Sequence, residues 1–345
     1  MSMNKCGKIR LYACGGTGIN IAKRVNEREA DMSNGFAGIS RVFVDTSYTN
    51  VDATVPEESI FIVGRDTAAL GNHRSEGSGK NRLANEEEIA GAVDNIMSKY
   101  PPLDLNIVVF NASGGTGSVA GPFIMNWLLE MGQNAVALVI GNEASAQAAT
   151  NTFDTLKTLD KISALREAPL VVNYLHQTRT NTRDEMDQHA IGAITSLSIL
   201  ASRQNDELDM EDIHNLFNYT EVCDVHPQLT LLEIFVGKDE VEQLYETVPV
   251  IGMGAVLGDK STPLPDVKFL YDAVGYYQEE NRGTGICDLY YVITTHGMDK
   301  ILKTMQENEE ESTRILAGQT KRVSFSEAAT TTRRGKSKES KTGLL

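Results

Sequence analysis

Cysteine, tryptophan and long apolar segments are scarce in this sequence, whose 345 residues include four cysteines and one tryptophan. Cys6, Cys14, Cys223 and Cys287 show neither a CxxC pair nor zinc-type spacing, so we expect free thiols in a reducing compartment and no structural metal. No apolar run approaches the ~20 residues that span a bilayer. The first residues, MSMNKCGKIRLY, contain no apolar signal segment. We therefore expect neither export nor membrane insertion.

Basic residues are also few relative to acidic ones. Lys and Arg total 32 against 47 Asp and Glu, a net charge of −15 at pH 7. Such a field repels nucleic acid and anionic membranes. Residues 313–345 are the exception, with eight basic side chains and two acidic ones. This basic tail could contact the acidic body of a neighbouring copy, or an outside anionic partner such as nucleic acid.

Residues 105–131 read as a strand, a phosphate-sized loop and a helix. Residues 107–110 are apolar and rich in β-branched side chains, as in a strand buried on both faces. The loop SGGTGS follows, and Pro122 lies in the first turn of the helical pattern. Unobstructed N–H groups at the positive end of a helix can bind a phosphate chain. The alternative is a glycine-rich turn without a ligand; the loop lacks the Lys of the GxxxxGK[ST] motif.

A second strand, over residues 8–14, runs into the glycine loop GGTG and another helical pattern. This order does not match the GxGxxG of dinucleotide-binding proteins. A further strand, over residues 41–44, ends at Asp45. The Asp45 carboxylate could approach a phosphate-bound Mg²⁺, or it could simply cap the following turn.

Strand patterns alternate with helical patterns as far as residue 172, which predicts an α/β fold with a parallel sheet and helices on both faces. A long helix is expected over residues 184–202, followed by an acidic loop. In the second region, 229–295, we expect antiparallel strands that form a separate small sheet. A helix over 298–316 precedes a Ser, Thr, Lys and Arg-rich segment that we expect to be disordered.

Several linked motifs resemble the tubulin/FtsZ superfamily, and within it the phage tubulins of the PhuZ family. They are GGTGINIA, GGTGSVAG, DTLKTLDKI and VVNY, followed by the long helix and a DxxD loop. The resemblance covers most of the chain. It implies a parallel-sheet GTPase domain over residues 1–183 and a long central helix over 184–203. A smaller α+β activation domain with a C-terminal helix would span 204–317, and a flexible basic tail 318–345.

The resemblance also implies that GTP or GDP binds with Mg²⁺ along four loops and at two further side chains. In chain order these residues would be Gly15, Gly16, Thr17, Gly18 and Asn20; Asp45 and Thr46; Gly79, Lys80 and Asn81, which sense the γ-phosphate; Ser113, Gly114, Gly115, Thr116, Gly117 and Ser118; and Asn173 and Asp187 at the guanine. Asp45 would approach Mg²⁺. Asp209 and Asp212 would be catalytic residues, supplied in trans to the active site of the next subunit.

Three departures from the family pattern stand out. Ser113 replaces the usual first Gly of the signature loop, Glu207 replaces an Asn often found two residues before Asp209, and the tail is basic where phage tubulins have an acidic one. The function implied is a GTPase, activated by polymerisation, that assembles head to tail with itself into dynamic cytoskeletal filaments. These would work in the cytoplasm of an infected bacterium, where they would position the phage nucleus and transport capsids. A plasmid-segregation or cell-division filament and a non-polymerising nucleotide-binding enzyme remain open alternatives.

Overall fold

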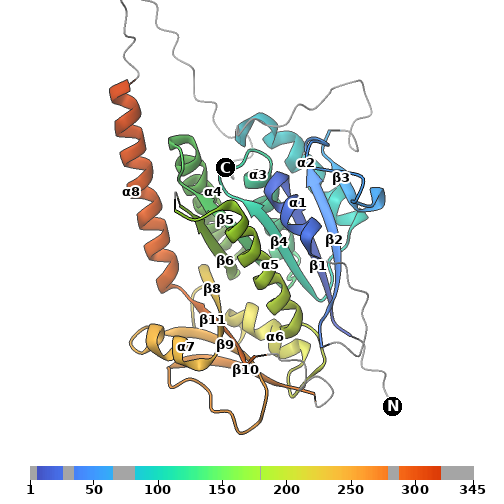
Figure 1. Cartoon of the computed structure of the whole chain (residues 1–345), viewed down its shortest axis with the longest axis vertical. Helices are drawn as coiled ribbons and strands as arrows, with labels where there is room; N and C mark the ends of the chain where they lie inside the picture. Colours follow the sequence, from blue (N-terminus) through green and yellow to red (C-terminus); the bar gives the residue numbers. More distant parts are fainter. Residues whose placement is uncertain (1–5, 26–34, 65–81, 179, 279–286, 320–345) are drawn as a thin grey trace, which may run out of the picture.

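One mixed β-sheet forms the centre of the protein (Figure 1). The computed structural model describes residues 6–25, 35–64, 82–178, 180–278 and 287–319. Within these residues the sheet has 11 strands in the order β3-β2-β1-β4-β5-β6-β8-β11-β9-β10-β7. Residues 320–345, which include most of the expected tail, lie outside the described residues.

The first half of the sheet is parallel throughout. Its strands are β1 (Lys8–Cys14), β2 (Gly38–Asp45), β3 (Ile60–Ile62), β4 (Leu105–Asn111), β5 (Ala135–Asn142) and β6 (Leu170–Gln177). Apolar side chains cover both faces of these strands, so they divide between two hydrophobic cores. All loops at the carboxyl ends of these strands consequently lie along one edge.

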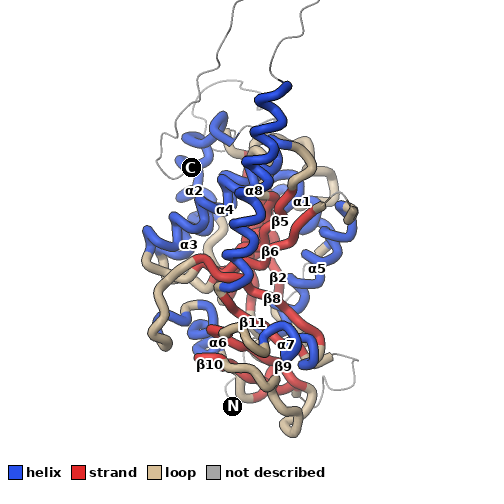
Figure 2. Tube along the Cα trace, turned by 90° about the vertical axis from the view of Figure 1, so that its left-hand side faces the viewer, coloured by secondary structure: helices blue, strands red, loops and turns tan. Residues whose placement is uncertain are grey.

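Helices pack on both faces of this parallel half (Figure 2). The first face carries α1 (Gly15–Arg24) and α5 (Arg183–Leu200). The other face carries α2 (Glu86–Lys99), α3 (Gly117–Glu130), α4 (Ala146–Arg166) and α8 (His296–Gln319). Short 3₁₀ helices span Glu57–Ser59, Arg82–Asn85 and Tyr219–Glu221. The expected layered α/β architecture is confirmed.

The second half of the sheet continues from the first without a break. Its strands are β7 (Asn205–Asp206), β8 (Leu229–Val236), β9 (Val250–Leu257), β10 (Phe269–Tyr277) and β11 (Leu289–Thr294), with helices α6 (Met210–Phe217) and α7 (Lys238–Tyr245). The prediction of a separate sheet was wrong, because β8 pairs in parallel with β6. The expected antiparallel pairing is confirmed for β11 with β8 and with β9, whereas β10 pairs in parallel with β9. The division into domains at residues 183, 203 and 317 stays a prediction.

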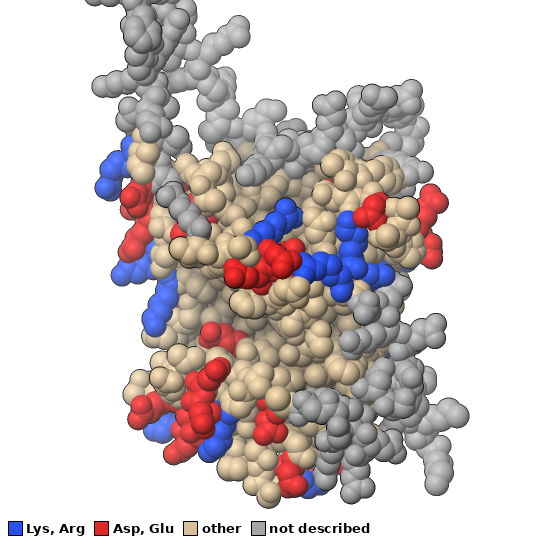
Figure 3. Space-filling model, viewed as in Figure 1, with Lys and Arg blue, Asp and Glu red and all other residues tan. Residues whose placement is uncertain are grey.

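Charged side chains are unevenly placed on the surface. On the face in Figure 3, acidic side chains gather over α7, and a band of adjoining basic and acidic side chains crosses the region of α1 and α5. Pairs such as Lys23–Asp52 and Arg24–Asp184, both at 2.9 Å, belong to this region. In the part of the chain that the structure describes, no helix combines the length and apolar character needed to cross a membrane.

Candidate functional site

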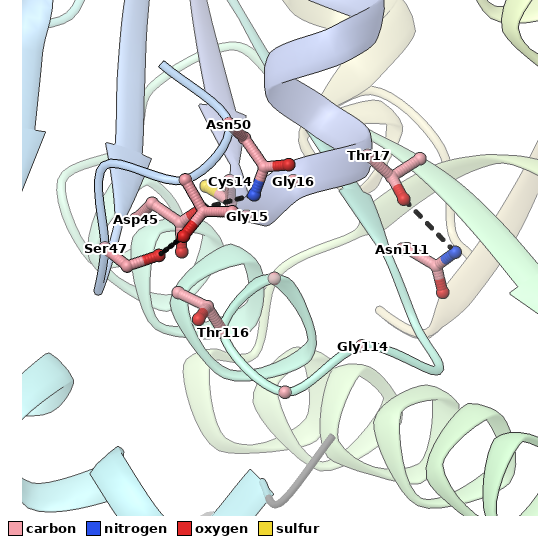
Figure 4. Close-up of a pocket in the computed structure, with 13 residues that line it drawn as sticks. Cys14, Gly15, Gly16, Thr17, Asp45, Ser47, Asn50, Asn111, Gly114 and Thr116 are labelled. Carbon is pink, nitrogen blue, oxygen red and sulfur yellow. Dashed lines mark hydrogen bonds between the residues drawn. The ribbon is translucent and has the colours of Figure 1, made fainter. Parts of the chain in front are cut away.

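A polar cavity of about 290 Å³ opens at the carboxyl ends of β1, β2 and β4. We call it the carboxyl-end cavity. The loops that follow these strands form its wall, because the carboxyl ends of parallel strands share one edge of a sheet. The lining residues are Cys14, Gly15, Gly16, Thr17, Asp45, Ser47, Thr49, Asn50, Asn111, Gly114, Gly115, Thr116 and Gly117 (Figure 4).

Helices α1 and α3 both begin at the carboxyl-end cavity. Their N-cap residues, Cys14 and Thr116, form no side-chain cap, and neither first turn contains an acidic residue. Every other α-helix in the described residues has a side-chain cap or an acid in its first turn. Two uncapped helix ends therefore direct N–H groups and positive dipole ends at one cavity. This arrangement suits an anionic ligand.

Two glycines allow the loop after β1 to contact the loop after β4. Gly15 has a φ of 69°, in the left-handed region, and a Cβ on it would lie 2.8 Å from the backbone N of Gly117. A Cβ on Gly117 would lie 2.7 Å from the carbonyl oxygen of Cys14. Side chains at these two positions would push the helix ends apart, so both loops need glycine where they meet.

Asp45 lies in the wall of the cavity and is only 4% exposed. Its carboxylate accepts hydrogen bonds from the backbone N–H of Thr46 at 2.8 Å and from Nδ2 of Asn50 at 3.2 Å. Burial raises the pKa of Asp45, and these hydrogen bonds partly oppose the shift. The Thr46 hydroxyl bonds the Thr116 hydroxyl at 2.9 Å and so joins the second loop to the start of α3.

Asp45 alone offers too few ligands to hold a metal ion, so an ion bound there would need further ligands from another molecule. Within the described residues, no group of three or more His, Cys, Asp or Glu side chains could hold a metal. Mg²⁺ commonly takes one or two protein carboxylates and fills its other positions with phosphate oxygens and water. One buried carboxylate beside a cavity for anions fits a Mg²⁺ that arrives with a phosphate.

Asn111 and Cys14 complete the floor of the cavity. The Asn111 Oδ1 accepts from the backbone N–H of Ser113 at 2.7 Å and its Nδ2 donates to Thr17 Oγ1 at 3.5 Å (Figure 4). Cys14 is fully buried, and burial raises the pKa of its thiol far above the usual range. The thiol therefore stays protonated and is no candidate nucleophile.

The structure brings many of the predicted residues together, but not all. In the cavity wall lie Gly15, Gly16, Thr17, Asp45, Gly114, Gly115, Thr116 and Gly117. Close to it but not in the wall are Gly18, Asn20, Thr46, Ser113 and Ser118. Gly79, Lys80 and Asn81 lie outside the described residues.

Asn173 and Asp187 lie apart from the wall, on β6 and α5. Both are buried, and the Oδ1 atom of each has no hydrogen-bond partner among the described residues. The other oxygen of Asp187 lies 3.5 Å from Arg24 of α1, and burial raises the Asp187 pKa while Arg183 and Arg24 lower it. Each Oδ1 atom is thus a buried acceptor that a donor group of a ligand could satisfy.

Asp209 and Asp212 lie on the opposite side from the carboxyl-end cavity, near the amino ends of the parallel strands. Their loop follows Ser202, whose carbonyl accepts from Gly7 before β1, and Arg203, which pairs with Asp104 before β4 at 2.8 Å. Asp209 caps α6 through the N–H groups of Glu211 and Asp212, and Asp212 bonds the Asp209 N–H in return. The pair thus forms a capping box at the amino ends of the strands.

Sequence reasoning missed several wall residues, namely Ser47, Thr49, Asn50 and Asn111, and gave Cys14 no role. A signal existed for Asn111, which directly follows an apolar strand and precedes Ser and Gly, a typical Asx-turn position. No local pattern marks Asn50, because its role depends on the contact with Asp45.

Known proteins with a similar sequence are phage proteins. Residues 208–298 match the family model of the phage tubulin-like protein C-terminal domain. The phage tubulin-like protein of Pseudomonas phage PhiPA3 is 28% identical over 305 residues, which cover 88% of this chain and 90% of that protein. The phage tubulin-like protein of Pseudomonas phage phiKZ is 25% identical over 320 residues, 92% of this chain and 94% of that protein.

Solved structures show the same fold. The protofilament of TubZ from bacteriophage PhiKZ has a TM-score of 0.81 and 24% identity, and covers 92% of this chain and 95% of its own. The phage tubulin PhuZ with GDP has a TM-score of 0.80 and 24% identity over 93% and 96% of the two chains. The FtsZ dimer of M. jannaschii has a TM-score of 0.58 and 16% identity over 84% and 88%. The chain is therefore similar in sequence to the phage tubulin-like proteins over most of its length and shares the fold of the TubZ, PhuZ and FtsZ structures.

Proposed function

We propose that this protein binds GTP in the carboxyl-end cavity, assembles head to tail into filaments, and hydrolyses GTP where two copies meet. The observation that carries the proposal is the placement of two features at opposite edges of one sheet. An anion site between two uncapped helix ends lies at the carboxyl edge, and an acidic pair lies at the amino edge.

The phosphates would lie between the starts of α1 and α3, and the base towards α5. Guanine presents two donor groups, N1–H and N2, on one edge, and the unpartnered Oδ1 atoms of Asn173 and Asp187 are acceptors. Asn20 is one helical turn before Arg24, which pairs with Asp187, so it would border the same space. Asp45 would hold Mg²⁺, which when bound neutralises charge on the phosphates.

Hydrolysis would need a second copy. Strand β1 has seven residues, so its two ends are roughly 20 Å apart at about 3.3 Å per residue. Asp209 and Asp212 therefore cannot reach the cavity of their own chain. In a head-to-tail stack they would meet the γ-phosphate of the neighbouring copy and orient the attacking water. Such a contact does not close on itself, so it produces a filament and couples turnover to assembly.

The capping box dictates how the acidic pair should be tested. Alanine at position 212 would remove both the carboxylate and a helix cap. Asp209→Asn and Asp212→Gln remove the charges while keeping side chains that can cap α6. We expect each variant to assemble with GTP but to release phosphate at least about tenfold more slowly, the loss of a water-orienting group.

The measurement is light scattering across a protein concentration series after addition of GTP, with GDP and ATP as controls and phosphate release in parallel. A GTP-specific rise above a critical concentration, with phosphate release only above it, is expected. Turnover proportional to protein at every concentration, without scattering, would instead mean a self-contained enzyme. Unchanged turnover in both variants would remove Asp209 and Asp212 from the chemistry.

We further propose that the filaments act in the cytoplasm of an infected bacterium, where they position the phage nucleus and move capsids. Support comes from the relatives, which are proteins of Pseudomonas phages. Fluorescent fusion protein imaged during infection tests this role. Filaments that contact neither the phage DNA compartment nor capsids would contradict it.

A further inference from the structure

Helix α4 buries an unusual number of polar side chains. Asn151, Thr152, Thr155 and Thr158 are each at most 4% exposed, although the helix packs against the sheet. A helix face of this kind normally carries apolar residues, and buried polar groups are costly without hydrogen bonds. The hydrogen-bond partners of these side chains therefore indicate why polar residues occupy this face of α4.

Two of them bond the loop that leads from β4 to α3. The Thr155 hydroxyl lies 2.9 Å from the carbonyl oxygen of Ala112, and its proton is shared with the Asn151 carbonyl at 2.7 Å. Asn151 Nδ2 donates to the carbonyl of Ser113 at 3.1 Å. Gln147 donates to Asn151 Oδ1 at 2.8 Å, which fixes the orientation of that amide.

With these bonds, each carbonyl from residue 111 to residue 116 lies within hydrogen-bond distance of a donor inside the protein, and the Gly114 and Gly115 carbonyls share the single Ser118 hydroxyl proton. The remaining pairs are Gly114 N–H to Asn111 O, the Ser118 hydroxyl to Gly114 O and to Gly115 O, and the N–H groups of Val119 and Ala120 to Thr116 O. The N–H of Gly115 has no acceptor among the described residues, and the first N–H groups of α3 have no intrahelical acceptor. The loop thus turns its carbonyl oxygens inwards and keeps N–H groups for the cavity.

Peptide orientation decides whether such a loop attracts or repels an anion. If the peptide of Ala112 or Ser113 turned over, its carbonyl oxygen could face the cavity and oppose a phosphate. Loops with glycines at positions 114, 115 and 117 resist such rotation poorly, because glycine adopts both signs of φ. Bonds within the loop hold the N–H sides of these two peptides, from Ser113 N–H to Asn111 Oδ1 and from Gly114 N–H to the Asn111 carbonyl. Contacts from α4 hold their carbonyl sides.

We propose that Asn151 and Thr155 are positioning residues that hold the Ala112 and Ser113 carbonyls away from the carboxyl-end cavity, so that the loop presents N–H groups to the phosphates of the nucleotide. This inference rests on the proposed nucleotide binding. The same helix bonds the end of β5, through Thr152 and the Asn142 N–H and carbonyl at 3.1 and 2.9 Å. It therefore braces two neighbouring loops of the carboxyl edge.

The test compares ligands with and without phosphate. Thr155→Val removes the hydroxyl and keeps the side-chain shape; Asn151→Ala removes the amide donor. Binding of GDP and of guanosine to the full chain is measured by calorimetry. We expect GDP affinity to fall about tenfold in each variant, as for loss of one buried hydrogen bond. Guanosine affinity should stay at the wild-type value, because guanosine does not use the phosphate loop.

Two controls separate positioning from stability. Thr155→Ser should restore GDP affinity, since it keeps the hydroxyl. Ser163 lies on the same helix, is fully buried, and donates to the Ala168 carbonyl at 2.6 Å, away from the cavity. Ser163→Ala should lower the unfolding temperature without changing the ratio of GDP to guanosine affinity.

Equal losses for GDP and guanosine, or unchanged GDP affinity with reduced thermal stability, would overturn the positioning role. If Thr155→Val does not fold, Asn151→Ala and Thr155→Ser decide the matter by the same ratio. Wild-type protein that binds neither GDP nor GTP would instead overturn the proposed function, which the first titration of the series establishes.

Discussion

At the scale of the residue, Asp45 faces opposing demands. Burial raises its pKa, whereas coordination of Mg²⁺ requires the ionised carboxylate. The hydrogen bonds from the Thr46 N–H and Asn50 favour the ionised form and point its oxygens along the cavity wall. A positive ion in the cavity would favour it further. Asp45 is thus a carboxylate whose charge depends on its ligand.

A pH dependence follows. A raised pKa means that Asp45 takes up its proton at a higher pH than a free Asp. We expect the affinity for GTP with Mg²⁺ to fall as the pH drops through this raised pKa, by about tenfold per pH unit for one proton. In Asp45→Asn, binding should be weak and should not vary over the same pH range. Titrations with fluorescent GTP at fixed Mg²⁺ measure both, and identical pH profiles for the two proteins would assign the proton to another group.

At the scale of the element, the seam between β6 and β8 joins the two halves of the sheet. Three residue pairs, from Leu170 with Leu229 to Val172 with Leu231, form the parallel ladder. Asn173 extends it with its side chain, whose Nδ2 donates to the Leu232 carbonyl at 2.9 Å. The residue proposed to bind guanine therefore also holds the seam.

Replacing Asn173 should affect folding and binding together. We expect Asn173→Ala to lower the free energy of unfolding by about 1 kcal/mol, one buried hydrogen bond, and to weaken GDP binding as well. Asn106 is a matched control, because it is equally a buried strand Asn and bonds the Leu103 and Asn134 carbonyls near the amino edge. Asn106→Ala should lose stability but not GDP affinity. Denaturant unfolding without nucleotide that leaves Asn173→Ala at the wild-type value would contradict the role in the seam.

Local pattern predicts the parallel half of the sheet well, because its strands are apolar on both faces and run directly into glycine loops. Local pattern fails where the arrangement depends on which strands pair with each other. The apolar run LTLLEIFV does not reveal that β8 joins β6. The sequence of β10, FLYDAVGYY, mixes Asp and Gly with aromatic residues and shows no clear strand pattern. Helix α4 begins at Ala146, in a stretch where small and polar residues blur the helical period.

The residues of the candidate site likewise fall into those that local pattern identifies and those that it does not. The glycines of both loops could be identified because the chain itself requires them at strand-to-helix turns. Asn151 and Thr155 could not, since a helical Asn or Thr is a cap, a surface residue or a brace depending on what the fold places next to it. Their role appears only when α4 is seen against the Ala112 and Ser113 carbonyls.

At the scale of the whole molecule, the cavity and the acidic pair lie at opposite ends of the parallel strands. An active site would then belong to two copies, each contributing one edge. Two variants with different defects should therefore restore GTP hydrolysis when mixed. An enzyme with a complete active site in each copy would not show this recovery.

An equal mixture of Asp45→Asn and the double variant Asp209→Asn, Asp212→Gln tests this. Each alone should release little phosphate. In a random filament, about a quarter of the contacts would join an intact cavity to an intact acidic pair, so turnover should recover to about a quarter of the wild-type value. Sedimentation verifies that both variants enter the same filaments. No recovery despite co-assembly would contradict a shared active site.

The two uncapped helix ends also bear on how long a copy survives. Without a ligand, two positive helix ends adjoin one cavity with no counter-charge from a cap or a first-turn acid, and a bound anion would supply that charge only in the folded state. A ligand at 100 times its Kd adds about 2.7 kcal/mol to the free energy of unfolding. If the cavity binds a nucleotide as proposed, chains without it would unfold more often and be cut sooner by proteases, so the supply of nucleotide would set the lifetime of the protein.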